Sequence, residues 1–313
     1  MSEAESFTPD VRQILLISHP RYQAEAEAYK EALDGWMDVR LEESKPEGWE
    51  PNAEHIGKLI GQDMGVAIGV IGGDGTFNDI ATGLIRNAEL AKRASITPVC
   101  GGNAYDVRRG VHGRWPMSPR KLFSRGIRGV EVHGLEFTIE DEAGEVTASE
   151  IAISYGGIGE SALASGRVNS DKYQNGRRLI RDAKIVGGTL LSNYELSIQS
   201  GDENPKLLRT IEFNKGPAEA KLGVIPVQYR DPEYHINHVE ARFAAGCRSM
   251  AGLLIGHGGG YNTSEPYQFT VESTADNRPA PFHMDGDVYP GGIAIGSAVT
   301  VGLTENTYTL LSR

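Results

Sequence analysis

The sequence predicts an α/β domain followed by a β-rich domain that forms an antiparallel sheet or sandwich. Over roughly the first 130 residues, apolar strand-like runs alternate with helix-like segments, which is the order found in a mostly parallel sheet covered by helices. From Glu131 onward the pattern changes to short strands of alternating apolar and polar residues with turns between them. A chain of 313 residues is long enough for two domains of ~150 residues. We therefore predict domains at 1–130 and 131–313.

The first domain is expected to alternate strands and helices from its start. Strands are predicted at 13–18, 36–41, 66–71 and 96–99. The third of them, VAIGVI, is apolar on both faces, as is typical of a buried parallel strand. Helices are predicted at 21–33 and 53–62. A third helix follows from the helical spacing of Phe77, Ile80, Ala81, Leu84, Ile85 and Ala88.

The second domain is expected to consist mainly of short antiparallel strands. Strands are predicted at 130–140, 149–157, 194–200, 209–214, 222–229, 237–243, 267–273 and 298–303. One helix is predicted at 175–183.

Composition narrows the class of protein. A net charge of -11 argues against nonspecific nucleic-acid binding, so no nucleic-acid partner is expected. No apolar stretch approaches the length of a membrane span, and the N-terminal residues MSEAESFTPD lack the apolar run of a secretory signal. Only Cys100 and Cys247 are present, so no disulfide framework is expected. We therefore expect a cytoplasmic protein.

Positive charge gathers in one segment of this acidic chain. Between Asp106 and Glu131 there is no acidic residue, and the positive residues there are Arg108, Arg109, Arg114, Arg120, Lys121, Arg125 and Arg128. Such a segment would attract ATP, an anionic acceptor or an anionic membrane surface, and the alternative is an ordinary solvated basic face. Peripheral contact with a membrane is therefore one possible role of this segment. A homodimer is also possible.

A glycine turn follows the predicted strand at 66–71. Gly72, Gly73, Asp74, Gly75 and Thr76 lead directly into the third helix. A helix start exposes unpaired N–H groups and a positive helix end, and glycine lets a phosphate approach the backbone closely. The alternative is that these glycines only supply positive φ angles for a tight turn. The motifs GxxxxGK[ST] and GxGxxG are both absent.

The segment GGDGTFND at 72–79 resembles the catalytic-domain signature of the diacylglycerol kinase family, which includes bacterial lipid kinases and sphingosine kinases and is more distantly similar to NAD kinases. The segment TPVCGGN at 97–103 is similar to the family's P-x-G-T-G-N-D-F-A. It has Ala104 where the family has an aspartate, and Asp106 is a candidate replacement. The alternative is that Asn103 caps a helix that has Asp106 at its third position.

Two further segments continue the resemblance in the second domain. YGGIGE at 155–160 is similar to the glycine-containing stretch that opens the family's second domain, with Ser154 and Glu160 where the family has Asn and Asp. HMDGD at 283–287 resembles the family's V-D-G-E, with Asp287 in place of the glutamate. Taken alone, its Asp-Gly pair is equally typical of a plain hairpin turn.

The resemblance covers essentially the whole chain. It implies an N-terminal Rossmann-like nucleotide domain and a C-terminal β-rich (sandwich-like) acceptor domain, whose last strands return to the cleft between the two domains. It also implies ATP and Mg²⁺ as cofactors. It implies that Asp74 and Asp287 hold the metal ion and that Asp285 or Asp74 accepts the proton of the substrate hydroxyl. The phosphate-binding residues that it implies are Gly72, Gly73, Gly75, Thr76, Asn78, Gly101, Gly102 and Asn103.

Together these features predict a phosphotransferase that moves the γ-phosphoryl group of ATP to a hydroxyl of a lipid or isoprenoid-type alcohol. One alternative is a catalytically impaired homologue that binds nucleotide or lipid and regulates a partner, because Ala104 replaces an aspartate and Asp287 is shorter than the family's glutamate. The other alternative is an NAD kinase, although the Asn-Glu pair of those enzymes has no convincing match in the sequence.

Overall fold

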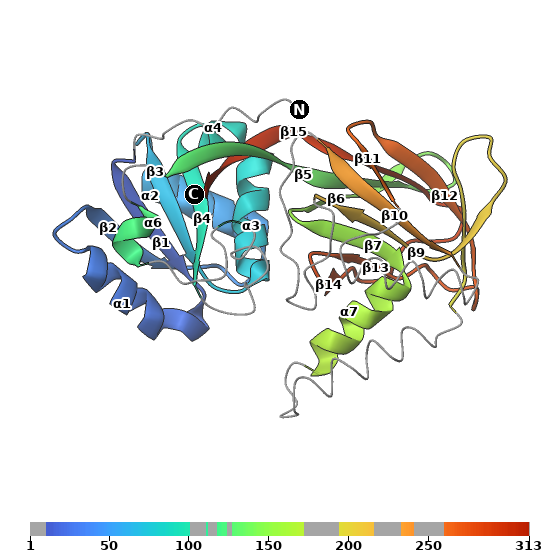
Figure 1. The fold of residues 1–313 in the computed structure, drawn as a ribbon, viewed down its shortest axis with the longest axis horizontal. Helices are drawn as coiled ribbons and strands as arrows, with labels where there is room; N and C mark the ends of the chain where they lie inside the picture. The colour runs from blue at the N-terminus through green and yellow to red at the C-terminus, as the bar shows by residue number, and fades with distance from the viewer. Residues whose placement is uncertain are drawn as a thin grey trace. The chain divides into compact units, whose positions relative to one another are not determined.

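The computed structural model describes residues 11–100, 111, 118–123, 127–171, 194–215, 233–240 and 260–312. The described residues divide into two compact units, coloured along the chain in Figure 1. The first unit contains the residues up to Gly134 and those from Thr304 onward, and the second contains Leu135 to Leu303. The boundary between the units lies close to the predicted one, but the residues from Thr304 onward belong to the first unit.

The sheet of the first unit is parallel. Its strands are β1 (Gln13–Ser18), β2 (Asp38–Glu43), β3 (Val66–Ile71) and β4 (Ala94–Cys100), in the spatial order β2-β1-β3-β4. The C-terminal strand β15 (Ala298–Ser312) pairs in parallel with β4 through Thr309 and Leu310. The predicted strands at 13–18 and 66–71 are confirmed to the residue, and the other two are confirmed within a few residues.

The helices of the first unit are η1 (Pro20–Tyr22), α1 (Gln23–Leu33), α2 (Trp49–Ile60), α3 (Asp74–Arg86), α4 (Ala88–Ala91) and α6 (Pro119–Leu122). α1 lies on one side of the parallel strands and α3 on the other (Figure 1). The apolar stripe predicted for α3 is buried from Phe77 to Ile85, whereas Ala88 begins α4. α2 and α3 pack closely, because a Cβ atom on Gly83 would lie 2.9 Å from that of Ala53.

The sheet of the second unit is antiparallel. Its spatial order is β14-β13-β7-β9-β8-β12-β15, with β10 pairing with β9 and with β11, and β5 pairing with β15 and with β6. The strand bounds are β5 (Arg128–Glu140), β6 (Val146–Ala152), β7 (Tyr155–Gly159), β8 (Leu196–Gln199), β9 (Lys206–Asn214), β10 (Tyr234–Glu240), β11 (Tyr261–Thr263), β12 (Tyr267–Thr274), β13 (Phe282–Met284) and β14 (Asp287–Val288). The predicted mixture of parallel strands followed by antiparallel strands is therefore confirmed.

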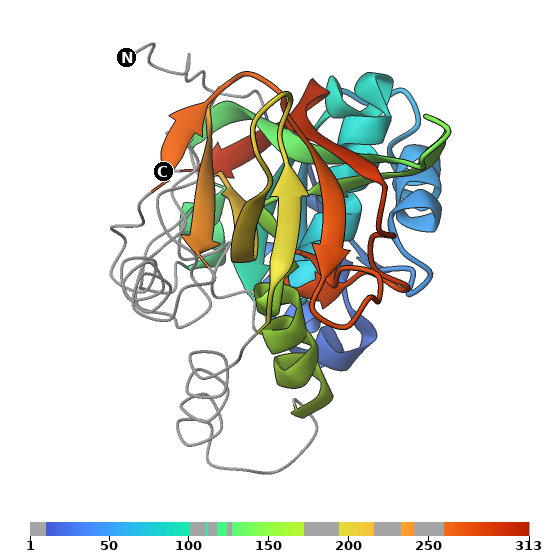
Figure 2. The same ribbon diagram turned by 90° about the vertical axis from the view of Figure 1, so that its right-hand side faces the viewer.

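Three local predictions differ from the structure or lie outside it. The single strand predicted at 149–157 is two strands, β6 and β7, because the chain turns at Ile153 and Ser154. Helix α7 (Glu160–Asp171) was not predicted, since its sequence is polar, contains Gly166 and lacks a helical apolar stripe. It follows β7 directly and packs against β7, β13 and β14 (Figure 2). The strand predicted at 222–229 and the helix predicted at 175–183 lie outside the described residues.

No helix in the described part of the chain is long and apolar enough to cross a membrane.

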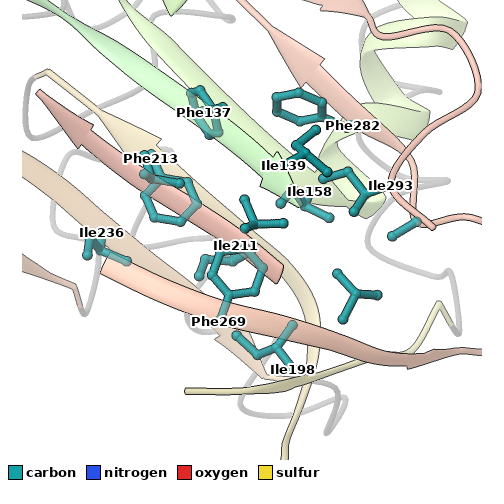
Figure 3. Close-up of a cluster of buried hydrophobic side chains, with 14 of the residues drawn as sticks. Phe137, Ile139, Ile158, Ile198, Ile211, Phe213, Ile236, Phe269, Phe282 and Ile293 are labelled. Carbon is teal, nitrogen blue, oxygen red and sulfur yellow. The ribbon is translucent and has the colours of Figure 1, made fainter. Parts of the chain in front are cut away.

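Aromatic and aliphatic side chains fill the core of the second unit (Figure 3). Phe213 of β9 lies at its centre, stacked on Phe269 with ring centroids 6.2 Å apart and edge-on to Phe137 at 5.6 Å. Ile158 of β7 and Phe282 of β13 join the same cluster. β13, which carries the first residues of the predicted motif at 283–287, and its neighbour β7 are thereby anchored in one core.

We expect Phe213→Ala to lower the free energy of unfolding by about 3–5 kcal/mol, because the substitution removes a ring from a closely packed core and leaves a cavity. Urea denaturation followed by circular dichroism measures the effect. Leu207→Ala is the control on the same strand, since Leu207 is 51% exposed and its truncation should change stability by less than about 1 kcal/mol. Equal losses in both variants would contradict the packing described.

Candidate functional site

The glycine turn joins β3 to α3. β3 ends at Ile71 and α3 begins at Asp74, so the motif occupies the strand-to-helix position expected from the sequence. The N–H of Gly72 donates to the carbonyl oxygen of Cys100 at 2.9 Å, which fixes the turn to the end of β4. Gly73 is the N-cap residue and offers no side chain to cap the helix. The positive end of α3 is thus available to an anion.

Gly72 and Gly73 differ in what surrounds them. A Cβ atom on Gly72 would lie 2.8 Å from Oγ1 of Thr76, so glycine is needed there for packing. A Cβ atom on Gly73 would meet nothing within 4 Å. The φ of Gly73 is -78°, which any residue can adopt, so a positive φ is not the reason for glycine at this position. Open space beside its backbone is what an approaching phosphate would use.

The remaining predicted residues of this turn lie on the first two turns of α3. Asp74 is half-buried at the first helical position, and Thr76 is buried beneath the turn. Asn78 follows Asp74 by one helical turn and lies on the same face, and its Oδ1 atom is buried without a hydrogen-bond partner among the described residues. The predicted second wall of Gly101, Gly102 and Asn103 lies outside the described residues, as does Ala104.

Asp285 lies in a hairpin turn and binds a row of backbone N–H groups. With φ angles of 50° and 92°, Asp285 and Gly286 form a two-residue turn between β13 and β14, so the plain-turn interpretation is correct for the backbone. The side chain does more. Its Oδ2 accepts the N–H of Ile153 at 2.7 Å, and its Oδ1 accepts those of Ser154 at 2.7 Å and Tyr155 at 3.1 Å.

The surroundings of Asp285 favour a carboxylate that can exchange a proton near neutral pH. Burial raises the pKa of Asp285 to about 6, the three N–H donors oppose that rise, and the charge of Asp287 adds to it. A carboxylate has about four acceptor positions, and these hydrogen bonds use three of them. The position left on Oδ2 can accept a hydrogen bond from a hydroxyl group.

Asp287 begins β14 and is exposed. Its carboxylate is a hard oxygen donor of the kind that Mg²⁺ prefers, and so, in the first unit, is that of Asp74. Within the described residues, no group of three or more His, Cys, Asp and Glu side chains comes together.

Several buried polar residues of the second unit were not predicted as functional. Glu160, the first residue of α7, forms an ion pair with Arg209 at 2.9 Å, and both side chains are buried. Nε2 of His283 lies 3.2 Å from Oγ of Ser161 and 3.6 Å from Oε1 of Glu212. Glu160 belongs to the segment 155–160 that the sequence analysis singled out. Gly157 of the same segment leaves room for Glu212, because a Cβ atom there would lie 2.5 Å from Oε2 of Glu212.

Arg120 of the basic segment has a structural partner. Nε of Arg120 donates to the carbonyl oxygen of Ala32 at 3.1 Å, in the last turn of α1, where a positive charge is favourable. Arg108, Arg109, Arg114 and Arg125 lie outside the described residues. Contact of this segment with a membrane surface stays a prediction.

No family model matches the sequence, and no curated protein matches it either. Solved structures do match. A Bacillus anthracis str. Sterne protein provisionally assigned as a diacylglycerol kinase is similar with a TM-score of 0.61 and 15% identity, over 97% of this chain and 98% of that one. A structure of a diacylglycerol kinase from the same organism gives a TM-score of 0.57 at 14% identity, with the same coverage.

Yeast NADH kinase complexed with NADH is also similar, with a TM-score of 0.52 and 10% identity over 97% of this chain and 84% of that one. The chain has the fold of these kinases. At identities of 10–15% the likeness establishes the fold, and it extends over nearly the whole chain. The resemblance predicted from four short segments is thereby confirmed at the level of the fold.

The raised pKa of Asp285 predicts how stability depends on pH. A raised carboxyl pKa means that the folded state binds more protons than the unfolded state between the ordinary value of 3.8 and about 6. We therefore expect the free energy of unfolding to fall, relative to Asp285→Asn, as the pH rises from 4 to 6, and the difference to stay constant at higher pH. Urea titrations of both proteins across this range measure it. A difference that does not change with pH, or that changes in the opposite direction, would contradict burial as the dominant influence.

Proposed function

We propose that the protein is an ATP- and Mg²⁺-dependent phosphotransferase that moves the γ-phosphoryl group of ATP to a hydroxyl of a lipid or isoprenoid-type alcohol. The observation that carries the proposal is the Asp285 carboxylate, held by three N–H donors with one acceptor position left on Oδ2. The kinase fold and the glycine turn support it. We take the first unit as a Rossmann-like nucleotide domain and the second as a sandwich-like acceptor domain.

Asp285 is proposed as the base. Three hydrogen bonds fix the direction of its carboxylate, and a pKa of about 6 keeps the group ionised at neutral pH while leaving it basic enough to take a proton. Oδ2 accepts the proton of the acceptor hydroxyl as its oxygen forms a bond to the γ-phosphorus. The bond from that phosphorus to ADP breaks, and ADP leaves with the electron pair.

Asp74 and Asp287 are each proposed as a ligand of Mg²⁺, which would offset phosphate charge when bound. The small number of carboxylates suits this ion, because Mg²⁺ usually keeps several waters and takes only one or two carboxylates together with substrate phosphates. Asp74 lies beside the glycine turn, so we assign it to the metal ion rather than to the base.

The nucleotide phosphates are proposed to bind the glycine turn. The N–H groups of Gly72, Gly73 and Gly75 and the hydroxyl of Thr76 supply donors at the positive end of α3. Asn78 adds an amide whose Oδ1 has no partner within the unit. Gly101, Gly102 and Asn103 are proposed as the second wall.

Gly73→Ala is expected to weaken ATP binding about tenfold, ~1.4 kcal/mol, because the added methyl group fills the space through which a phosphate reaches the backbone. The variant should still fold and lose only about 0.5–1 kcal/mol of stability, since that space is open but alanine is a poorer N-cap residue than glycine. Isothermal titration calorimetry with Mg-ATP measures the affinity. Gly57→Ala in α2 is the matched control, because its Cβ atom also meets nothing within 4 Å, and it should bind ATP normally. Normal binding by Gly73→Ala would contradict the assignment.

Asp285→Asn is expected to lower kcat/KM by about 100- to 10,000-fold, because the amide cannot accept the hydroxyl proton. For the wild-type protein, kcat/KM should rise with pH up to about 6 and then level off. Transfer of labelled phosphate from Mg-ATP to a panel of lipid and isoprenoid alcohols measures both effects. Asp202→Asn, at an exposed turn, is the control and should retain full activity. If the wild-type protein phosphorylates no alcohol in the panel, the proposal fails.

A second candidate is phosphorylation of a nicotinamide dinucleotide, because one of the similar structures is an NADH kinase complexed with NADH. Adding NADH to the same panel tests it, and NADH as the preferred acceptor would replace the lipid alcohol in the proposal.

A further inference from the structure

One face of the antiparallel sheet is polar although it is buried. Along β9 the side chains alternate, so that Ile211 and Phe213 enter the apolar core shown in Figure 3 while Glu212 and Asn214 lie on the opposite face. An alternating strand ordinarily presents its polar side to solvent, yet Glu212 is 1% exposed and Asn214 is 0% exposed. Buried polar groups need hydrogen-bond partners.

Four strands contribute to this face. The register places Glu212 of β9 opposite Gly157 of β7 and Asn237 of β10, and it places His283 of β13 opposite Gly157 on the other side. Since Gly157 lacks a Cβ atom, the Glu212 carboxylate lies directly over it. We call Glu212, Asn214, Asn237 and His283 the polar face.

Some atoms of the polar face find partners within the protein. Nε2 of His283 contacts Oγ of Ser161 and Oε1 of Glu212. Oδ1 of Asn237 lies 3.1 Å from Nε2 of His235. These contacts fix the orientation of the side chains, so the polar face has a defined geometry.

Other atoms of the same residues have no hydrogen-bond partner in the described structure. They are Oε2 of Glu212, both amide atoms of Asn214, and Nδ2 of Asn237. The set contains two acceptors and two donors. A hydroxyl group both donates and accepts, so several adjacent hydroxyls can satisfy all four atoms. A phosphate would be repelled by Glu212, and a metal ion would leave the amide donors unpaired.

The polar face lies next to the proposed base. The N–H of Asp285 donates to the carbonyl oxygen of Tyr155 at 2.7 Å, and Tyr155 is paired across the sheet with Asn214. The ring of Tyr155 also lies 5.8 Å from that of His283. Tyr155 therefore contacts both the base and the polar face.

We propose that the polar face binds a polyhydroxylated group of the acceptor, one hydroxyl of which is the group deprotonated by Asp285. The inference rests on the proposed function and narrows its acceptor to a polyol, either as a free molecule or as the head group of a lipid. The bonds formed and broken are those given above for phosphoryl transfer.

A matched set of acceptors tests the chemistry. Free glycerol and myo-inositol, vesicles of phosphatidylglycerol or phosphatidylinositol, and the single-hydroxyl alcohols diacylglycerol and farnesol are each offered with Mg-ATP. We expect kcat/KM to be at least tenfold higher for one of the polyol-bearing arms than for the single-hydroxyl alcohols. The comparison of free polyols with vesicles identifies the source. An equal or higher value for diacylglycerol or farnesol would overturn the inference and leave the proposed function standing.

Variants of the polar face separate binding from folding. Asn214→Leu and Glu212→Gln should raise KM for the preferred polyol at least tenfold. Because Asn214→Leu removes two buried atoms without partners, its urea midpoint should not fall. Thr210→Val is the control on the same face. The Thr210 hydroxyl already donates to the carbonyl oxygen of Ile158 at 2.7 Å, so this variant should lose stability and keep its KM.

The two proposals can fail separately. If the wild-type protein phosphorylates no alcohol, the proposed function fails, and calorimetric titration of myo-inositol and glycerol into the wild-type protein and Asn214→Leu then tests the polar face directly. Binding by the wild-type protein that Asn214→Leu loses would support it. Absence of binding by the wild-type protein, or an unchanged KM in both polar-face variants, would show that the face is filled only by ordered water and would overturn it.

Discussion

The second unit depends on the capture of three consecutive backbone N–H groups by the carboxylate of Asp285. The residues that it joins, Asp285 and Ser154, lie 131 positions apart in the sequence. N–H groups between two strands cannot remain unpaired in a protein interior, so the carboxylate permits the chain to break between β6 and β7. The same contact sets β7 beside β13, and through β7 it sets the register of the polar face on β9.

This arrangement combines rigidity with chemical reactivity. A carboxylate that is buried and yet bound by three donors has opposing influences on its pKa, and the balance places that pKa near 6. The polar face likewise combines fixed side chains with unused hydrogen-bonding groups. His283 contacts Ser161 and Glu212, while amide atoms of Asn214 and Asn237 have no partner in the described structure. Partly satisfied buried networks reduce stability, which is why such groups are more typical of binding sites than of structural cores.

Glycine serves close approach in both units. Gly72 leaves room for Thr76 beneath the turn, Gly73 leaves the backbone open, and Gly157 leaves room for the carboxylate of Glu212. At Gly286, where φ is 92°, the backbone conformation itself favours glycine, as it does at ten other described glycines with positive φ, among them Gly159 at 101°. Glycine therefore serves close packing at some positions of this chain and a left-handed backbone at others.

Local patterns in the sequence determined the parallel strands at 13–18 and 66–71 and the apolar stripe of α3. They also determined the order of the four short segments that resemble a kinase family. Each of these features depends only on residues that are neighbours along the chain. Helix α7 and the break at Ile153 escaped prediction, since each depends on distant partners. An alternating strand such as β9 shows that its two faces differ but not that both are buried. Only the tertiary structure decided that Glu212 and Asn214 are enclosed, because burial of a strand's face depends on what packs over it and not on the strand's own residues.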